Sequence, residues 1–260
     1  MITAGIDMGA KNIKVVLLED GKRILAKSQL PVGTDTKAAT ERAFAEALGK
    51  AGLKMDDVRH ITSTGTGRTT APYAKDNVTE VSAGAKGAVF LHPGTRTVID
   101  VGAEEGKCLR CDAAGKVIDF AVNEKCAAGA GSFMEAMARA LEVPLEELGP
   151  LALKSTKTIP MNAQCAVFAE SEVVTLVHQK TAKEDIARAV NDAIADRITS
   201  MVRKVGFDPD VVLIGGVARN KAFVEAIKRN LQIQVMVPED PEYVGALGAA
   251  LAAAELEGVR

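Results

Sequence analysis

The sequence predicts an α/β protein built from two halves that share one plan. Short apolar segments bounded by turn residues alternate with longer segments that carry small and apolar residues at helical spacing. The first strand also contains a pentapeptide, Ile6-Asp7-Met8-Gly9-Ala10, that returns later as Ile99-Asp100-Val101-Gly102-Ala103. An internal repeat of this kind indicates two structural units of one design. We place the halves at residues 1–93 and 94–260.

Composition limits the class of protein. A chain of 260 residues with 47% hydrophobic content is long enough for a large core, in one long domain or in two of about half the length. The net charge of −2, with both signs mixed, argues against a nucleic-acid partner. No basic-then-apolar leader follows Met1, and no apolar run reaches the ~20 residues of a membrane helix. We therefore expect a cytoplasmic protein that contacts neither nucleic acid nor membrane.

The first half is expected to open with a hairpin of three strands. The turn residues and apolar periodicity place these strands at 2–7, 13–18 and 23–30. A helix at 36–51 ends at a glycine, and the half closes with a strand at 60–64 and a helix at 82–91.

The second half repeats the hairpin and then adds helices. Lys107 stands at the same offset from its Asp-x-Gly turn as Lys14 does in the first half. Helices are expected at 131–141, 165–179 and 184–204. They are followed by a strand at 211–214, a helix at 221–230, a strand at 234–237 and a helix at 243–256.

Both copies of the repeat end a strand with an Asp-x-Gly turn, at Asp7 and Asp100. The backbone N–H groups of such a turn are able to point at phosphate oxygens, and the carboxylate holds Mg²⁺ through its waters. Two such turns facing each other across a cleft would clamp one nucleotide. The alternative for either turn alone is an ordinary strand connection.

A third element, the buried strand at 211–214, leads through Gly215 and Gly216 into a helix. Glycines in this position let the backbone lie against a flat ligand such as a purine, with a helix N-terminus nearby. Taken alone, the same stretch is a plain strand-to-helix turn.

Cys126 and Cys165 each stand at the start of a predicted helix. The positive end of the helix dipole stabilises a thiolate there and makes it a better metal ligand. Because the chain is too long and too poor in cysteine for a disulfide scaffold, its cysteines are free, catalytic or metal-bound. Two cysteines cannot complete a four-thiolate site, but two copies related by a dyad can.

These segments resemble known motifs. Residues 7–14, 100–103 and 213–220 resemble the phosphate-1, phosphate-2 and adenosine motifs of the actin, Hsp70 and sugar-kinase superfamily. Residues 125–131 and 165–173 look like those of one branch, the BadF/BadG/BcrA/BcrD-type ATPases. That branch contains the 2-hydroxyacyl-CoA dehydratase activators and the ATP-binding subunits of class I benzoyl-CoA reductase. The resemblance implies a duplicated actin/Hsp70/sugar-kinase-like (ribonuclease H-like) α/β fold, with two halves around a nucleotide cleft.

The resemblance also implies which residues serve Mg²⁺ and ATP. The catalytic residues implied are Asp7, Asp100, Glu104 and Glu105. The nucleotide-binding residues implied are Gly9, Ala10, Lys11, Asn12, Lys14, Gly102, Ala103, Gly129, Ala130, Gly131, Gly215, Gly216, Val217 and Ala218. Lys11 either meets phosphate directly or is a solvated turn residue.

In proteins of this branch, thiolates matching Cys126 and Cys165 in both subunits of a dimer hold one [4Fe–4S] cluster. Four thiolates suit such a cluster, and a two-fold axis supplies them from two per chain. ATP binding and hydrolysis change the angle between the cluster-bearing helices. The resemblance therefore implies that a reduced ferredoxin or flavodoxin supplies low-potential electrons, which pass on to an acyl-CoA reductase or dehydratase.

The second turn departs from the activator pattern. Dehydratase activators usually carry Gly-Gly-Gln-Asp there, whereas this chain has Gly102-Ala103-Glu104-Glu105. That turn looks more like the smaller ATPase subunit (the D type) of class I benzoyl-CoA reductase, which favours a heterodimer with a related ATPase subunit. The alternative is a homodimeric activator of a 2-hydroxyacyl-CoA dehydratase. Alternatives of other classes are a sugar-kinase-like phosphotransferase without a cluster and a chaperone-like ATPase with structural thiols.

Two further motifs have competing interpretations. Cys108 and Cys111 have metal-site spacing, but residues three apart on a strand point to opposite faces, which favours a structural role. Gly65-Thr66-Gly67-Arg68 is either a turn at the nucleotide cleft or a plain loop at a strand end.

Overall fold

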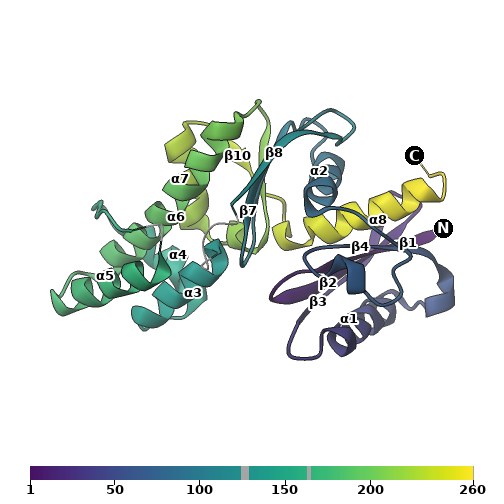
Figure 1. The fold of residues 1–260 in the computed structure, drawn as a ribbon, viewed down its shortest axis with the longest axis horizontal. Helices are drawn as coiled ribbons and strands as arrows, with labels where there is room; N and C mark the ends of the chain where they lie inside the picture. Colours follow the sequence, from purple (N-terminus) through teal and green to yellow (C-terminus); the bar gives the residue numbers. More distant parts are fainter. Residues whose placement is uncertain (124–128, 163–164, 260) are drawn as a thin grey trace. The chain divides into compact units, whose positions relative to one another are not determined.

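The computed structural model describes residues 1–123, 129–162 and 165–259. The chain forms two compact units, which Figure 1 shows as a ribbon. Unit 1 comprises Met1–Arg96, Arg110–Ile118 and Glu242–Arg260, and unit 2 comprises Thr97–Leu109 and Asp119–Pro241. The C-terminal segment thus belongs to the same unit as the N-terminus, whereas the repeat in the sequence divides the chain once, after residue 93.

Unit 1 is organised on a five-stranded sheet with the order β3-β2-β1-β4-β5. Strand β1 runs antiparallel to β2 and parallel to β4, so the sheet is mixed. The strands are β1 (Ile2–Met8), β2 (Asn12–Glu19), β3 (Arg23–Pro31), β4 (Val58–Thr64) and β5 (Asp76–Asn77).

Helices cover both faces of this sheet, and Figure 1 shows α1 and α8 on opposite sides of it. The alternation of β2 accounts for this arrangement, since successive side chains point to opposite faces. Val15 and Leu17 pack into the core under α1, whereas Val16 and Leu18 pack against α8. The helices of unit 1 are α1 (Thr36–Ala51), α2 (Glu80–Leu91) and α8 (Val244–Leu256).

Unit 2 is organised on a second five-stranded sheet with the order β10-β9-β6-β7-β8. The strands of this sheet are β6 (Thr97–Val101), β7 (Gly106–Cys111), β8 (Val117–Asn123), β9 (Val211–Ile214) and β10 (Val235–Met236). The last two residues of β7 and the first two of β8 belong to unit 1. Its helices are α3 (Ala130–Ala140), α4 (Leu145–Ala152), α5 (Ala166–His178), α6 (Lys183–Val205) and α7 (Lys221–Leu231), and Figure 1 shows them gathered together. Their inner faces form one apolar core with β6 and β9.

Most expected elements lie within two residues of the observed ones. The sequence did not reveal α4, because Pro150 lies inside this helix and interrupts its pattern. The last expected helix, 243–256, is observed as α8, and only its expected first residue, Tyr243, belongs instead to a short 3₁₀ turn, Pro241–Tyr243. Among the described residues no helix combines the length and the apolar character that crossing a membrane requires.

Candidate functional site: two turns and two helix starts

The Asp7 turn, residues 7–12, connects β1 to β2 in unit 1. Asp7 lies opposite Lys14 in the antiparallel register, and Lys14 Nζ lies 2.9 Å from Asp7 Oδ2. Both side chains are largely buried but reach the surface, with 15% of Asp7 and 17% of Lys14 exposed. The turn between the two strands contains Gly9, Ala10 and Lys11, and β2 begins at Asn12.

Two glycines, Gly65 and Gly9, lie close to the Asp7 carboxylate. A Cβ atom added at Gly65 would lie 2.6 Å from Asp7 Oδ1, and Gly65 has a φ of +92°. A Cβ added at Gly9 would lie 3.8 Å from the same oxygen and 3.0 Å from Lys14 Nζ. Larger residues at these positions would collide with their neighbours, so glycine allows both segments to lie close to Asp7.

The loop after β4 packs on this turn. The Gly67 amide donates a hydrogen bond of 3.1 Å to the Met8 carbonyl, and Thr66 Oγ1 donates one of 3.3 Å to the same oxygen. Gly65-Thr66-Gly67-Arg68 is therefore part of the Asp7 turn's surroundings and more than a plain strand end.

The Asp100 turn, residues 100–105, occupies the matching place in unit 2. Asp100 lies near the end of β6, and the Gly102 amide donates a hydrogen bond of 2.9 Å to the Glu105 carbonyl. Lys107 Nζ forms an ion pair of 3.0 Å with Glu105 Oε2. The lysine of the repeat thus contacts a carboxylate in both copies. In the first copy this carboxylate is Asp7, before the glycine of the turn, and in the second it is Glu105, after the glycine.

Gly215 follows β9 and lies beside Asp100. The register of β6 and β9 sets Asp100 opposite Ile214, and a Cβ at Gly215 would lie 2.7 Å from Asp100 Oδ1 and 2.4 Å from Val101 O. Gly215 has a φ of +89°, so both its conformation and its contacts require glycine.

The other residues of the predicted adenosine turn divide into two kinds. Gly216 is exposed, and no described atom lies within 4 Å of a Cβ built on it. Val217 and Ala218 are buried in the core of unit 2. Among the four residues 215–218, Gly216 is therefore the one whose backbone is exposed to solvent without a covering side chain.

The start of α3 is joined to the Asp100 turn by backbone hydrogen bonds. The Gly131 amide donates one of 3.1 Å to the Gly102 carbonyl, and the Ser132 amide donates one of 2.9 Å to the Ala103 carbonyl. A Cβ at Gly129 would lie 1.9 Å from Glu104 Cα. The segment Gly129-Ala130-Gly131, predicted to serve the nucleotide, is thus in direct contact with the predicted phosphate-binding turn.

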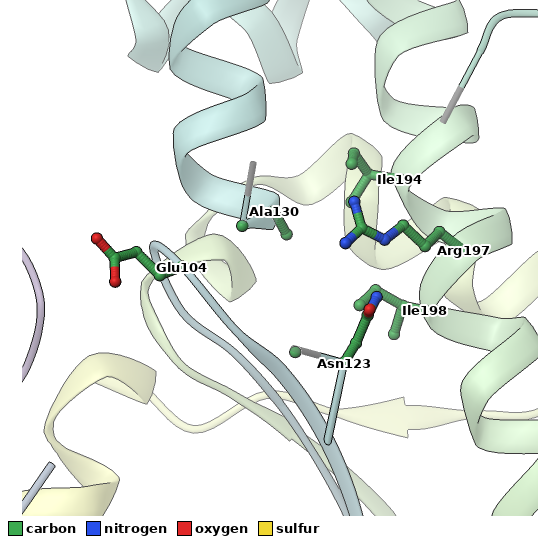
Figure 2. Close-up of a pocket in the computed structure, with 8 residues that line it drawn as sticks. Glu104, Asn123, Ala130, Ile194, Arg197 and Ile198 are labelled. Carbon is green, nitrogen blue, oxygen red and sulfur yellow. The ribbon is translucent and has the colours of Figure 1, made fainter. Parts of the chain in front are cut away.

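A small pocket adjoins this junction, between the β7–β8 hairpin, the start of α3 and α6 (Figure 2). With the Asn123 amide oriented so that its oxygen faces Arg197, that oxygen accepts hydrogen bonds of 2.7 and 3.2 Å from the guanidinium. Figure 2 shows the Glu104 side chain directed away from Asn123 and Arg197. Arg197 therefore fixes the end of β8, and Glu104 points elsewhere.

Cys165 immediately precedes α5 and is partly exposed. Its amide donates a hydrogen bond of 3.1 Å to Asn162 Oδ1, and the Asn162 amide in turn donates one of 2.8 Å to Glu172 Oε2. These two hydrogen bonds hold the backbone of Cys165 in place at the start of α5. Cys126 lies outside the described residues.

Cys108 and Cys111 are both buried on β7. Cys108 belongs to the core of unit 2, and Cys111 Sγ lies 3.9 Å from the Thr95 carbonyl. Burial raises the pKa of the Cys111 thiol. Both features agree with a packing role. Within the described ranges, no three His, Cys, Asp or Glu side chains are grouped as metal ligands.

The structure thus brings together, within unit 2, Asp100, the turn that follows it, the start of α3 and Gly215. Within unit 1 it brings together Asp7, Lys14 and the loop at Gly65. Gly245 of α8 is a further neighbour that was not predicted, and a Cβ added there would lie 3.7 Å from Asp7 Oδ2. No local signal identifies it, because the contact depends on how the C-terminal helix packs.

The comparisons with known proteins agree with these features. The pattern of the BadF/BadG/BcrA/BcrD ATPase family matches residues 4–253. The activator of lactoyl-CoA dehydratase of Anaerotignum propionicum is 40% identical over 255 residues, which are 98% of each chain. The 2-hydroxyisocaproyl-CoA dehydratase activator of Clostridioides difficile is 38% identical over 96% of this chain and 94% of its own.

Similarity to the benzoyl-CoA reductase branch is lower. The D-type subunit of the benzoyl-CoA reductase of Thauera aromatica is 33% identical over 96% of this chain and 92% of its own. The preference for this type of subunit, which rested on the four residues of the Asp100 turn, is therefore not supported over the activator alternative.

Solved structures agree in fold. Component A of the (R)-2-hydroxyglutaryl-CoA dehydratase of Acidaminococcus fermentans has a TM-score of 0.95 at 38% identity and covers 98% of both chains. The activator of the 2-hydroxyisocaproyl-CoA dehydratase from Clostridium difficile, solved with bound ADPNP, has a TM-score of 0.93 at 37% identity, over 98% of this chain and 95% of its own. A glucokinase of the ROK family from Streptomyces griseus shares the fold alone, at 15% identity and a TM-score of 0.58, over 98% of this chain and all of its own. The predicted actin/Hsp70/sugar-kinase-like fold is confirmed.

Proposed function

The chain belongs to the BadF/BadG/BcrA/BcrD ATPase family, and we propose that it is the ATP-hydrolysing activator of a 2-hydroxyacyl-CoA dehydratase. In this proposal two identical chains form the active dimer. A reduced ferredoxin or flavodoxin supplies the electrons, and ATP hydrolysis drives their transfer at low potential to the dehydratase.

The observation that carries the proposal is the junction between the Asp100 turn and α3. Two backbone hydrogen bonds, from Gly131 and Ser132, attach the start of this helix to the turn. Only two residues separate Cys126 from Gly129 in the sequence. In this proposal a displacement of the turn by the nucleotide moves the start of α3, which follows Cys126 closely in the sequence.

The described carboxylates support distinct roles in ATP hydrolysis. Asp7 and Asp100, at the ends of β1 and β6, are proposed to hold Mg²⁺ through its waters. Glu105 is already in an ion pair with Lys107, whereas Glu104 is exposed. This difference favours Glu104 as the carboxylate that orients the attacking water.

The donor chemistry at Cys165 fits an iron–sulfur ligand. The thiol is partly exposed at the N-terminus of a helix of 13 residues, where the dipole stabilises a thiolate. Cys165 and Cys126 from each of two chains would hold a [4Fe–4S] cluster, which supplies one-electron transfer at low potential when bound. Exposed apolar residues on α5, Val167 and Phe168, lie next to Cys165 and provide a surface for a second chain.

The test is an electron-transfer assay with anaerobically purified protein. The chain is reduced, mixed with a 2-hydroxyacyl-CoA dehydratase and its substrate, and supplied with ATP or with ADPNP. We expect dehydration with ATP and none with the non-hydrolysable analogue. If the protein instead activates the catalytic subunits of a benzoyl-CoA reductase, the proposed dehydratase partner is wrong. If the anaerobically purified protein hydrolyses ATP but contains no iron, the proposed electron-transfer function is wrong.

A further inference from the structure

Thr64 is the last residue of β4 and the direct neighbour of Asp7 across the sheet. The parallel register of β1 and β4 pairs Asp7 with Thr64. Paired residues of neighbouring strands project to the same face of a sheet. The Thr64 side chain therefore lies on the face of the sheet to which the Asp7 carboxylate points.

A contact with α8 locates both side chains further. A Cβ built on Gly245 would lie 3.7 Å from Asp7 Oδ2 and 3.9 Å from Thr64 Cγ2. Both residues thus border one small space at the N-terminus of α8, and glycine keeps that space open. Lys14 closes one side of it through its ion pair with Asp7 Oδ2.

The Thr64 hydroxyl makes no hydrogen bond within the described part of the protein. Thr64 is 1% exposed, and its Oγ1 has no hydrogen-bond partner among the residues that the structure describes. An unsatisfied buried hydroxyl costs free energy that an isosteric valine would avoid. What distinguishes Thr64 is its place beside the Asp7 carboxylate, where its hydroxyl is available to a ligand that the carboxylate binds.

We infer that Thr64 is a positioning residue, whose hydroxyl holds a Mg²⁺-bound water of the ATP complex against the Asp7 carboxylate. The inference rests on the ATP site of the proposed function. A carboxylate only accepts hydrogen bonds, whereas a threonine hydroxyl both donates and accepts, so the two together fix the orientation of one water. In hydrolysis the attacking water forms a bond to the γ-phosphorus as the bond to the ADP oxygen breaks, and ADP, phosphate and a proton are released.

The same strand offers a matched control. Thr62 is also fully buried, and its Oγ1 likewise has no partner in the described part of the chain. It projects to the same face but pairs with Gly5, where a Cβ would lie 1.9 Å from Ala246 O of α8. The helix backbone closes off this position, so Thr62 has the burial of Thr64 without its access to Asp7.

The experiment compares Thr64→Val, Thr64→Ser and Thr62→Val with the wild type in the full-length protein. ATP hydrolysis and the binding of a fluorescent ATP analogue are measured against Mg²⁺ concentration, together with Tm. We expect Thr64→Val to lower kcat about tenfold and to raise the half-saturating Mg²⁺ several-fold, with the KM for ATP at saturating Mg²⁺ nearly unchanged. Its Tm should equal or exceed that of the wild type. Thr64→Ser should restore both values, and Thr62→Val should behave as the wild type.

A Mg²⁺ dependence of Thr64→Val that matches the wild type would overturn the inference, as would equal losses in Thr64→Val and Thr62→Val. Failure of the proposed function is distinguishable, because it concerns electron delivery. An iron-free wild type that hydrolyses ATP would contradict the activator role and leave the Thr64 comparison valid.

Discussion

The Gly131 amide, in the first turn of α3, donates a hydrogen bond of 3.1 Å to the carbonyl of Gly102 in the Asp100 turn. The start of α3 and the Asp100 turn, which resembles a phosphate-binding motif, are thus joined by backbone hydrogen bonds. A change at the turn has to move α3 or break these bonds.

Gly129→Ala should uncouple electron transfer from ATP hydrolysis. The added Cβ would meet Glu104 Cα at 1.9 Å, so the turn and the helix must separate. We expect a loss of about 1–3 kcal/mol in the free energy of unfolding, as for other overpacked positions. The number of electrons delivered per ATP should fall at least tenfold.

Gly49→Ala, at a helical glycine with no atom within 4 Å, is the control and should leave the ratio unchanged. An unchanged ratio in Gly129→Ala would mean that the junction does not couple the two events.

Gly216→Leu should weaken ATP binding without loss of stability. No described atom lies within 4 Å of a Cβ at Gly216, so the protein itself gives no reason for glycine there. If the purine lies against this backbone, a large side chain displaces it, and the Kd for ATP should rise at least tenfold with Tm nearly unchanged. Isothermal titration and a thermal melt measure both quantities. ATP binding equal to that of the wild type would exclude Gly216 from the nucleotide site.

Asn162→Ala should make the backbone at Cys165 more mobile and the proposed cluster easier to remove. The Asn162 side chain accepts the hydrogen bond of the Cys165 amide at 3.1 Å, and loss of such a hydrogen bond costs about 1 kcal/mol. We expect iron to be lost to a chelator several-fold faster than from the wild type, as followed by absorbance under anaerobic conditions. The exposed Asn77, changed to alanine, is the control. Equal rates in all three proteins would show that Asn162 does not support the ligand.

Much of this site is visible in the sequence because it is encoded locally. The two Asp-x-Gly turns, the Gly215-Gly216 pair and the helix that begins after Cys165 each occupy a few consecutive residues. The structure has them as expected, with helix α1 observed at the predicted residues, Thr36–Ala51.

The contacts between distant segments were not predictable. The register of β1 and β4, which sets Thr64 beside Asp7, joins residues that are far apart in the chain. The junction of Gly131 with Gly102 depends on how α3 docks on its sheet. The preference for a reductase subunit is less well supported than the activator alternative for a related reason, since a departure at Ala103, Glu104 and Glu105 carries less information than similarity along the whole chain.

A pH dependence is expected at the end of α8. Arg59 Nε donates a hydrogen bond of 3.0 Å to Glu257 Oε2, and His60 Nδ1 lies 3.1 Å from Oε1. The Arg59 contact first, and then His60, hold the pKa of Glu257 below its usual value. A lowered pKa means that the interaction stabilises the fold above about pH 4.3 and that this stabilisation is lost as the pH falls through the folded-state pKa.

Glu257→Gln should therefore have a lower Tm than the wild type at pH 7, and the two values should converge below about pH 4. Thermal melts between pH 7 and about 3.5 test this, with the exposed Glu239, changed to glutamine, as the control. A difference in Tm that stays constant across this range would contradict the electrostatic explanation.

The central claim is that two copies of this chain complete one cluster, with Cys165 as a ligand. The most direct test is the iron content of anaerobically purified wild type, Cys165→Ser and Cys108→Ala, each measured with its native mass. We predict about four iron atoms per homodimer in the wild type and in Cys108→Ala, and almost none in Cys165→Ser, which should still bind ATP. A Cys165→Ser protein that keeps its iron, or a Cys108→Ala protein that is folded and loses it, would contradict the account.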